Sequence, residues 1–235
     1  NDIRYLGDIQ KFVDINDKTF CIDENLIKKN ISKKTKAILP VHIFGFSANI
    51  DAINKIAKEY GLKVIEDACQ AHGAEFRNKK VGTFNNTTTF SFYSNKIVTC
   101  GEGGMVVTTN KSKIKIAKLL RDHGRRKPHG ELIHDIIGYN YGLDELSSAL
   151  GVGQMKTIDK VLSHRERLSK HYDSILQGID GIQIPYRNPN FKRSWFVYYI
   201  KVSSGKIRTI IKNVLKKENI GTKYYYPSIH LQPCY

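Results

Sequence analysis

The stretch NIDAINKIAKEYGLKVIED, which runs from Asn49 to Asp67, decides the fold. Its first part places apolar residues at the spacing of one helix face, at Ile50, Ile53, Ile56 and Ala57. Gly61 follows where a helix C-terminus favours glycine. Residues 62–67 then form a short apolar run that is typical of a strand. The stretch therefore predicts a helix that leads directly into a strand.

The residues before this stretch supply another strand. KAILPVHIF, residues 36–44, is a continuous apolar run, which is typical of a strand buried on both faces. A strand, a helix and a second strand in this order favour a parallel sheet with a right-handed crossover. The sequence therefore predicts an α/β fold.

The rest of the chain continues with strands and helices. Further helices are predicted over 24–31, 111–124, 143–176 and 207–217, and a bend in the longest of them is expected near Gly151 and Gly153. β-prone runs predict strands over 11–15, 87–92, 104–109 and 194–202, with a hairpin over 73–84. We expect a large three-layer α/β/α domain with a mostly parallel sheet over 1–155. Part of a smaller α+β domain is expected over 156–235.

The chain is strongly basic, with 38 Lys+Arg against 22 Asp+Glu and a net charge of +16. This charge fits a nucleic-acid partner, an anionic small substrate, or drift of solvated positions toward lysine. The lysines are spread over many segments instead of forming one basic arm, which argues against a nucleic-acid partner. An anionic substrate and compositional drift remain open.

Composition also bears on membranes, metals and compartment. No run of about 18 apolar residues predicts a membrane span, and the start NDIRYLGDIQ lacks the pattern of a signal peptide. The 4 cysteines form no C-x-x-C pair, and no His or carboxylate cluster has metal-ligand spacing. We therefore expect no metal site, no disulfide framework, no membrane partner and a cytoplasmic location.

Polar side chains leave the predicted strand 62–67 together. Asp67 ends this strand, and Gln70 and His72 follow at once. In open parallel sheets, functional groups collect at the carboxyl ends of strands. Asp67 is therefore either a cap for the next turn or a carboxylate that pairs with a cationic ligand.

Lys96 is isolated in FSFYSNKIVTCGEGG, residues 90–104, where the other side chains carry no positive charge. A lysine held among aromatic and aliphatic residues is desolvated, which favours the neutral, nucleophilic amine that Schiff-base chemistry needs. Nearby hydroxyls, Ser91 among them, suit a phosphate, and the glycines allow close backbone approach. The alternative is a surface lysine in a loop.

Several motifs in chain order resemble one known family. They are VIEDACQAHGAEF (64–76), FSFYSNKIVTCGEGGMVVT (90–108) and GYNYGLDELSSALGVGQMKTID (138–159), together with LPVHIFGFSANIDAI (39–53) and GTKYYYPSIHLQPCY (221–235). The chain resembles the DegT-type (DegT/DnrJ-like) nucleotide-sugar aminotransferases, which use pyridoxal 5'-phosphate (PLP) and have the aspartate-aminotransferase fold. The similarity starts inside the family's large domain and stops inside its small one. The resemblance therefore implies that the chain corresponds to an internal part of such an enzyme.

The resemblance also implies roles for individual residues. Lys96 matches the lysine that carries the cofactor as a Schiff base and then moves the proton during transamination. Asp67 matches the acid that pairs with the pyridine nitrogen, and Gln70 matches the side chain near the cofactor's phenolic oxygen. Ser91 matches a hydroxyl that binds the phosphate. Asn140 matches an asparagine that reaches the cofactor phosphate of the neighbouring subunit, which implies a homodimer with a shared active site.

The implied reaction moves an amino group, from glutamate, to a keto group of a nucleotide-linked deoxysugar for surface glycans or other deoxysugars. The segment 91–104 resembles members that act at C4 of a 4-keto-6-deoxyhexose. His42, Tyr93 and His230 are candidate substrate contacts, although each histidine fits a packed or surface position equally well.

Two residues of this chain differ from those of some members of the family. Gly142 stands where family members usually have an arginine, and Lys96 differs from the histidine of members that dehydrate the sugar. The alternative function is a non-catalytic or truncated homologue that binds PLP as a regulator or scaffold. The basic segment 121–134 is either a diphosphate contact or a solvated loop.

Overall fold

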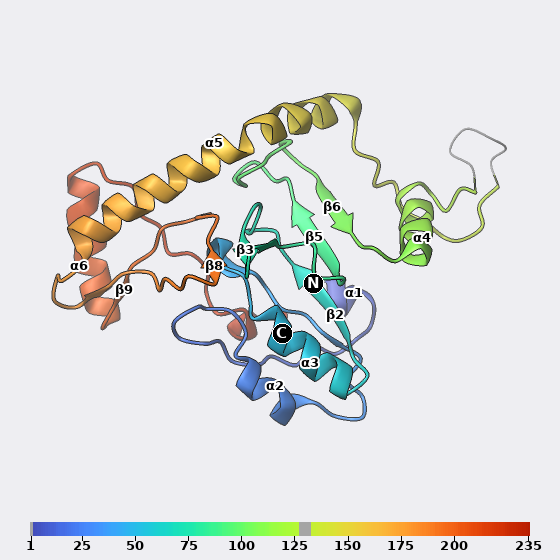
Figure 1. Cartoon of the computed structure of the whole chain (residues 1–235), viewed down its shortest axis with the longest axis horizontal. Helices are drawn as coiled ribbons and strands as arrows, with labels where there is room; N and C mark the ends of the chain where they lie inside the picture. Colours follow the sequence, from blue (N-terminus) through green and yellow to red (C-terminus); the bar gives the residue numbers. More distant parts are fainter. Residues whose placement is uncertain (1, 127–132) are drawn as a thin grey trace.

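The computed structural model describes residues 2–126 and 133–235. Its central sheet has the strand order β1-β2-β5-β6 (Figure 1). The strands are β1 (Ala37–Ile38), β2 (Lys63–Asp67), β5 (Thr87–Ser91) and β6 (Gly104–Val107). The pairings β1–β2 and β2–β5 are parallel, whereas β6 runs antiparallel to β5. The predicted α/β class with a mostly parallel sheet is therefore confirmed.

Helix α3 (Ile50–Glu59) packs on β1 and β2, and helix α2 (Glu24–Asn30) packs against α3. The Asn49 side chain caps α3, because its oxygen accepts a hydrogen bond from the Ala52 N–H at 3.3 Å. The apolar face expected from the sequence is the buried one, and it shares a core with Val64. Burying each large aliphatic side chain of this face stabilises the fold by about 1.5–3 kcal/mol.

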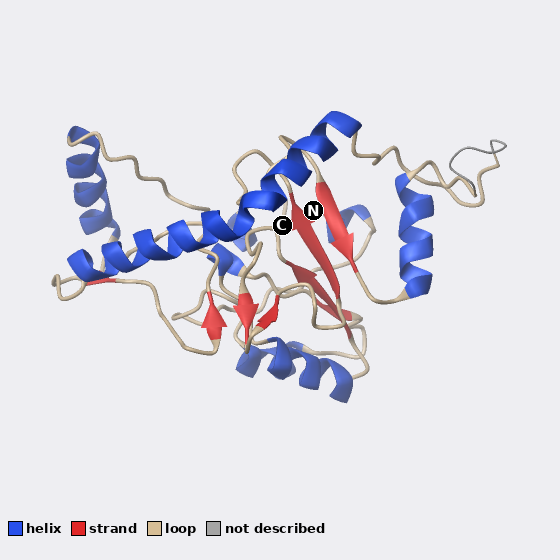
Figure 2. Cartoon of the chain, turned by 45° about the horizontal axis from the view of Figure 1, so that its top comes forward, coloured by secondary structure: helices blue, strands red, loops and turns tan. Residues whose placement is uncertain are grey.

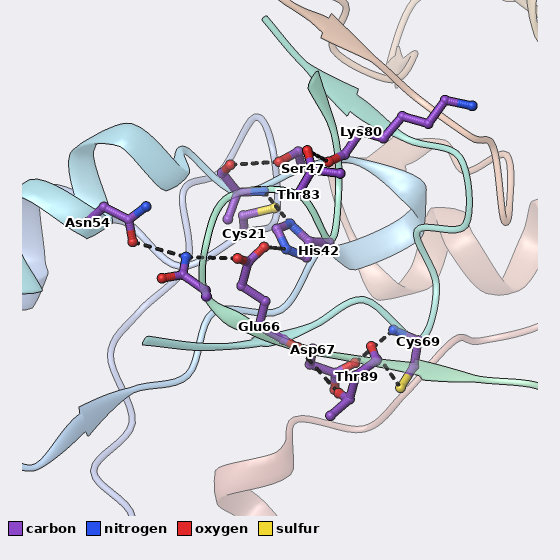
Figure 3. A network of polar contacts seen from close by, with 12 residues as sticks. Cys21, His42, Ser47, Asn54, Glu66, Asp67, Cys69, Lys80, Thr83 and Thr89 are labelled. Atoms are coloured by element: carbon purple, nitrogen blue, oxygen red, sulfur yellow. Dashed lines mark hydrogen bonds and ion pairs between the residues drawn. The ribbon is translucent and has the colours of Figure 1, made fainter. Parts of the chain in front are cut away.

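Strand β2 separates two consecutive carboxylates. Val64 and Glu66 point into the core, and Ile65 lies on the opposite, partly exposed face. Because side chains alternate along a strand, Asp67 shares the face of Ile65. Figure 3 shows Glu66 and Asp67 directed to opposite sides of the strand.

Helix α5 (Glu145–Leu176) is one continuous helix that runs from beside β5 and β6 toward α6 (Gly205–Lys217) (Figure 1). The helix continues without a break through Gly151 and Gly153, where the sequence predicts a bend. A side-chain carbon at Gly151 would lie 2.7 Å from Cys100 Sγ, so glycine here allows close packing. The expected domain boundary at 155/156 falls inside α5, so both parts of the chain share it.

The remaining elements are short or lie at the periphery. Helix α4 (Lys111–Arg121) stands apart from the sheet, as Figure 2 shows. Two small antiparallel sheets join β4-β3-β8 and β7-β9. The strands of these two sheets are β3 (Glu75–Phe76), β4 (Lys79–Lys80), β7 (Ile182–Gln183), β8 (Phe191–Lys192) and β9 (Lys201–Val202). The other short elements are the helices α1 (Asp2–Tyr5), η1 (Ile43–Gly45) and η2 (Ile229–Leu231). No helix of the described residues combines the length and apolarity needed to cross a bilayer.

Three predicted strands are wrong over most of their length. Residues 11–15 contribute only an isolated bridge, at Ile15. The run 36–44 forms a strand only at Ala37–Ile38, because Pro40 has no N–H to donate; it pairs with β2 once more through an isolated bridge at Val41 and then turns into η1. In 194–202 only the last two residues pair, because Trp195 and its neighbours are held by contacts to other segments.

Gly45 joins two segments that are far apart in sequence. Its backbone is in the left-handed region, at φ +77°, and its carbonyl accepts a hydrogen bond from the Ser194 N–H at 2.9 Å. A side-chain carbon at Gly45 would lie 2.5 Å from Ser194 Oγ and 2.9 Å from the Trp195 backbone nitrogen. Gly61 has a similar φ of +65° but open space around it.

We expect Gly45→Ala to lower the free energy of unfolding by about 1–3 kcal/mol more than Gly61→Ala, because only the first adds a clash to the backbone penalty. Urea denaturation of both variants measures the difference. Equal losses for the two variants would show that the carbon added at Gly45 makes no costly clash with Ser194 or Trp195.

The free cysteines differ in reactivity. Burial raises the pKa of the Cys21 thiol to about 12, and burial together with the Asp67 charge raises that of Cys69 to about 12. Cys100 is buried, and Cys234 is exposed. At pH about 8 we expect a single fast-reacting thiol with a disulfide reagent, because only thiolates attack. Cys234→Ser should remove the fast phase, and a fast phase that survives this change contradicts the assignment.

Candidate functional site

Asp67 lies at the carboxyl end of β2, on the face opposite the main core. Its backbone is fixed, because its N–H donates to the Pro40 carbonyl and its carbonyl accepts from the His42 N–H, both at 2.9 Å. Its Oδ1 accepts a hydrogen bond from the Cys69 N–H at 2.9 Å. Hydrogen bonds of its backbone and side chain therefore hold the Asp67 carboxylate in place at the end of the sheet.

Hydroxyl groups of β5 share this face. Asp67 pairs in register with Thr89, and Ser91 follows two residues later on the same side of the strand. The Ser91 Oγ accepts a hydrogen bond from the N–H of Tyr93 at 3.3 Å, which leaves its hydroxyl proton available to a ligand. Tyr93 itself is exposed. The parallel register therefore brings a carboxylate and hydroxyls together at one edge.

Lys96 is half-buried and extends from the loop after β5. Its Nζ lies 5.0 Å from the centre of the Phe196 ring, close enough for a cation–π contact. The positive charge of Lys96 also reaches the turn after β2, where it acts on both Cys69 and His72. The charges of Lys96 and Asp67 therefore both act on Cys69, in the turn after β2.

An aromatic wall, formed by Phe44, Phe196 and Tyr225, borders this region. Tyr225 contacts Phe44 at 4.9 Å and Phe196 at 6.1 Å between ring centres. The Phe44 N–H donates to Gln70 Oε1 at 2.9 Å, so the Gln70 amide group is left to donate to a ligand. The wall thus connects the lysine to the glutamine through packed rings.

The turn after β2 is dry. Burial, reinforced by the Lys96 charge, lowers the pKa of His72 to about 4, so this ring is neutral near pH 7. The ring packs 5.3 Å from Phe90 and 6.0 Å from Phe92, measured between ring centres. A dry surrounding strengthens electrostatic interactions between the site and a charged ligand.

His42 is not at this site. It is fully buried, and both ring nitrogens are engaged, with Nε2 2.8 Å from Glu66 Oε2 and Nδ1 accepting from the Ala48 N–H at 3.0 Å. In this position it has no surface to offer a substrate. The expectation of a substrate contact at His42 is therefore contradicted by its burial on the core face of β2.

Two other expected residues lie away from Lys96. Asn140 is exposed beside the end of α4, where its backbone bridges to Asp122. His230 lies on η2, and its ring is 6.3 Å from that of Phe12. Asp67, Gln70, Ser91 and Lys96 lie at the carboxyl ends of the paired strands β2 and β5 or in the segments that follow them, whereas Asn140 and His230 lie on other segments.

The basic segment 121–134 is only partly described, because residues 127–132 lie outside the described residues. Arg126 forms an ion pair with Asp135 at 2.7 Å, and Arg125 lies 3.7 Å from Asp122. These two arginines are therefore already paired with carboxylates.

Sequence reasoning missed Thr89, Phe196 and the burial of Glu66. The alternation of β2 contains a signal for Glu66, since a residue two positions after the buried Val64 must point into the core. Phe196 carries no such signal, because its place depends on the fold of 193–196 against η1.

The donor set fits PLP. A carboxylate suits the pyridine nitrogen, an amine suits the aldehyde, and neutral hydroxyl and amide donors suit the phosphate and the phenolic oxygen. Among residues 2–126 and 133–235, no cluster of His, Cys, Asp or Glu is arranged to hold a metal ion.

Comparisons with known proteins agree with this chemistry. GDP-perosamine synthase of Escherichia coli O157:H7 is 32% identical over 100% of this chain and 64% of its own length. The dTDP-3-amino-3,4,6-trideoxy-alpha-D-glucose transaminase of Streptomyces venezuelae is 33% identical over 91% of this chain and 55% of its own length. The solved structure of Helicobacter pylori PseC, an aminotransferase involved in the biosynthesis of pseudoaminic acid, superposes with a TM-score of 0.93 at 31% identity, over 99% of this chain and 63% of PseC.

The chain therefore spans less than two thirds of the length of these relatives. The model of the DegT/DnrJ/EryC1/StrS aminotransferase family, whose enzymes depend on PLP, matches residues 1–235. On this match and these relatives, the chain belongs to the DegT/DnrJ/EryC1/StrS aminotransferase family.

Proposed function

We propose that this protein transfers an amino group from glutamate to the keto group of a nucleotide-linked deoxysugar, with PLP as cofactor. The observation that carries the proposal is the convergence of Asp67, Ser91 and Lys96 at one edge of the sheet. Membership of the aminotransferase family gives this convergence its chemical meaning.

Each residue contributes a separate function. Asp67 holds a proton on the pyridine nitrogen, because an adjacent carboxylate favours the charged ring. Ser91 donates to the phosphate, and the Gln70 amide donates to the phenolic oxygen. Bound PLP supplies an electron sink, which stabilises negative charge on the carbon that loses a proton.

Lys96 holds the aldehyde and moves a proton at its Nζ. Its contact with Phe196 keeps the amine beside an apolar surface instead of bulk water. The aromatic wall excludes water from the same side, which limits loss of the moving proton to solvent. The neutral His72 adds no second positive charge that would compete for the phosphate.

The substrate and the assembly are also part of the proposal. We favour C4 of a 4-keto-6-deoxyhexose as the position aminated, with Tyr93 as a substrate contact and His230 as a second one. Asn140, which lies beside α4, would serve the cofactor phosphate of a second copy in a homodimer. Gly142 has open space around it and offers no side chain for the contact that an arginine would make. The cytoplasm, where nucleotide sugars are available, is the expected location.

Lys96→Ala should abolish both the visible absorption band of bound PLP and amino transfer, because the variant lacks the amine that is assigned to hold the aldehyde. The measurement incubates the chain with PLP, glutamate and GDP- or dTDP-linked 4-keto-6-deoxyhexoses, then follows the band and the amino sugar. Lys80→Ala, at an exposed lysine of β4, is the matched control and should change neither.

Turnover that survives Lys96→Ala would refute the assigned role. PLP binding without transfer to any keto sugar would instead support the non-catalytic alternative.

Asp67→Asn should keep the fold but lower turnover by about 100-fold or more, because the hydrogen bond to the Cys69 N–H is retained while the charge is lost. Melting temperatures check the fold, and steady-state kinetics check the activity. Unchanged turnover in a folded Asp67→Asn variant would show that the carboxylate charge is not needed.

A further inference from the structure

A cavity of about 330 Å³ is lined by α5 and by the segment 186–195. Its walls include three cations, which are Arg187, Lys192 and Arg193. Glu166 is the one carboxylate among the described residues that line it. None of the residues assigned to PLP lines this cavity. The cavity therefore has an excess of positive charge and is separate from the site of the proposed function.

Two of the three cations are paired with carboxylates of the chain. Arg187 Nη1 donates to Glu166 Oε1 at 3.0 Å, and Arg187 Nε donates to Asp173. Lys192 Nζ lies 3.0 Å from Glu75 Oε1. The charges of Arg187 and Lys192 are therefore balanced within the protein.

Arg193 is buried without such a partner. It is 7% exposed, and its Nε, Nη1 and Nη2 have no hydrogen-bond partner among the described residues. The guanidinium carbon instead lies 4.6 Å from the centre of the Phe46 ring, 5.0 Å from that of Trp195 and 5.4 Å from that of Tyr199. Ring faces attract the cation, but they do not replace acceptors for the five N–H groups of a guanidinium. Arg193 therefore keeps unused hydrogen-bond donors.

The positive charge of Arg193 is fixed by its chemistry, because a guanidinium stays protonated in proteins even where burial lowers its pKa. The acids beside it are neutral near pH 7. Burial raises the pKa of the Tyr199 hydroxyl against the effect of the Arg193 charge, and burial raises the pKa of the Cys21 thiol to about 12. Arg187, which also acts on Arg193, adds positive charge. A buried cation without a counter-charge is costly, and a bound anion removes this cost.

We propose that Arg193 and the Tyr199 hydroxyl bind a small oxyanion, a phosphate or a carboxylate group, at this cavity. The planar fork of a guanidinium donates two parallel hydrogen bonds to such a group. The Tyr199 hydroxyl, which has no hydrogen-bond partner among the described residues, is a further donor. Lys192 lines the cavity and is exposed, so the cavity reaches the surface there. The nitrogens of Arg193 are covered by the side chains around them, so binding must shift these side chains.

Trp195 gives a direct measurement of binding. It is the only tryptophan of the chain, and its ring lies 5.0 Å from the Arg193 guanidinium. The experiment titrates the whole chain with inorganic phosphate and with malonate, and sodium chloride at matched ionic strength is the reference. We expect each effective probe to change the tryptophan fluorescence and to raise the melting temperature as its concentration increases. The lower of the two dissociation constants shows whether the site prefers a phosphate or a carboxylate.

Arg193→Met removes the charge but fills the same space with a side chain that packs well on rings. Without a probe, this variant should melt at the temperature of the wild type or higher, because an unbalanced buried charge is gone. It should weaken binding of the preferred probe by about 10-fold or more. Arg77→Met is the matched control, because Arg77 also lies over a ring, 5.2 Å from the centre of Phe76, but is exposed and paired with Asp51. This control should leave the dissociation constant unchanged.

Three results would overturn the inference. One is a wild-type chain that responds to neither probe at up to about 10 mM, beyond the effect of sodium chloride. Another is an unchanged response of Arg193→Met, which together with a lower melting temperature would show that Arg193 serves only the packing of the rings. The third is a response that Ser91→Ala removes and Arg193→Met keeps, because the probe would then bind at the proposed cofactor site. The proposed function stands in all three cases.

Discussion

The parallel pairing of β2 with β5 is the constraint on which the rest of the structure depends. It fixes Asp67 beside Thr89 and Glu66 beside Thr88. Because successive side chains on a strand point to opposite faces, one of two adjacent carboxylates must enter the core while the other enters the site. Glu66 therefore lies in the core, where His42 and Asn86 satisfy its hydrogen bonds. Asp67 lies in the site, on a rigid strand.

A second constraint comes from the contact between η1 and the segment 193–196. Phe44 and Trp195 both have positive φ, at 55° and 54°, which bulky residues rarely adopt. Such conformations persist where surrounding contacts hold them, and they cluster at functional sites. Here the contacts are the hydrogen bonds from Phe44 to Gln70 and from Arg165 to the Trp195 carbonyl. The strained backbone therefore places the aromatic wall beside Lys96.

Local sequence patterns predicted the helices and strands that form because of the residues within them, without help from distant segments. The apolar spacing of 50–57 and the position of Gly61 gave α3 and its end, and the run before Asp67 gave β2. The segment 194–202 could not be predicted in this way, because its β propensity is overridden by contacts to α5 and η1. For the site, the residues indicated Asp67 and Lys96 separately, and only the family resemblance joined them. His42 was misjudged because a histidine in an apolar run carries no sign of its partner, which lies 24 positions away.

Helix α5 contacts the rest of the chain at separate points along its length. Gly151 packs on Cys100, Leu162 on Gly73, Arg165 on the Trp195 carbonyl, and Asp173 on the Tyr198 hydroxyl. Each of these residues faces its partner only because the helix is continuous and turns by a fixed angle per residue. One inserted or deleted residue between them would rotate everything beyond it by about 100° and shift it by about 1.5 Å. Exposed positions of this helix can therefore accept substitutions, whereas an insertion or deletion between the contact points would break the contacts beyond it.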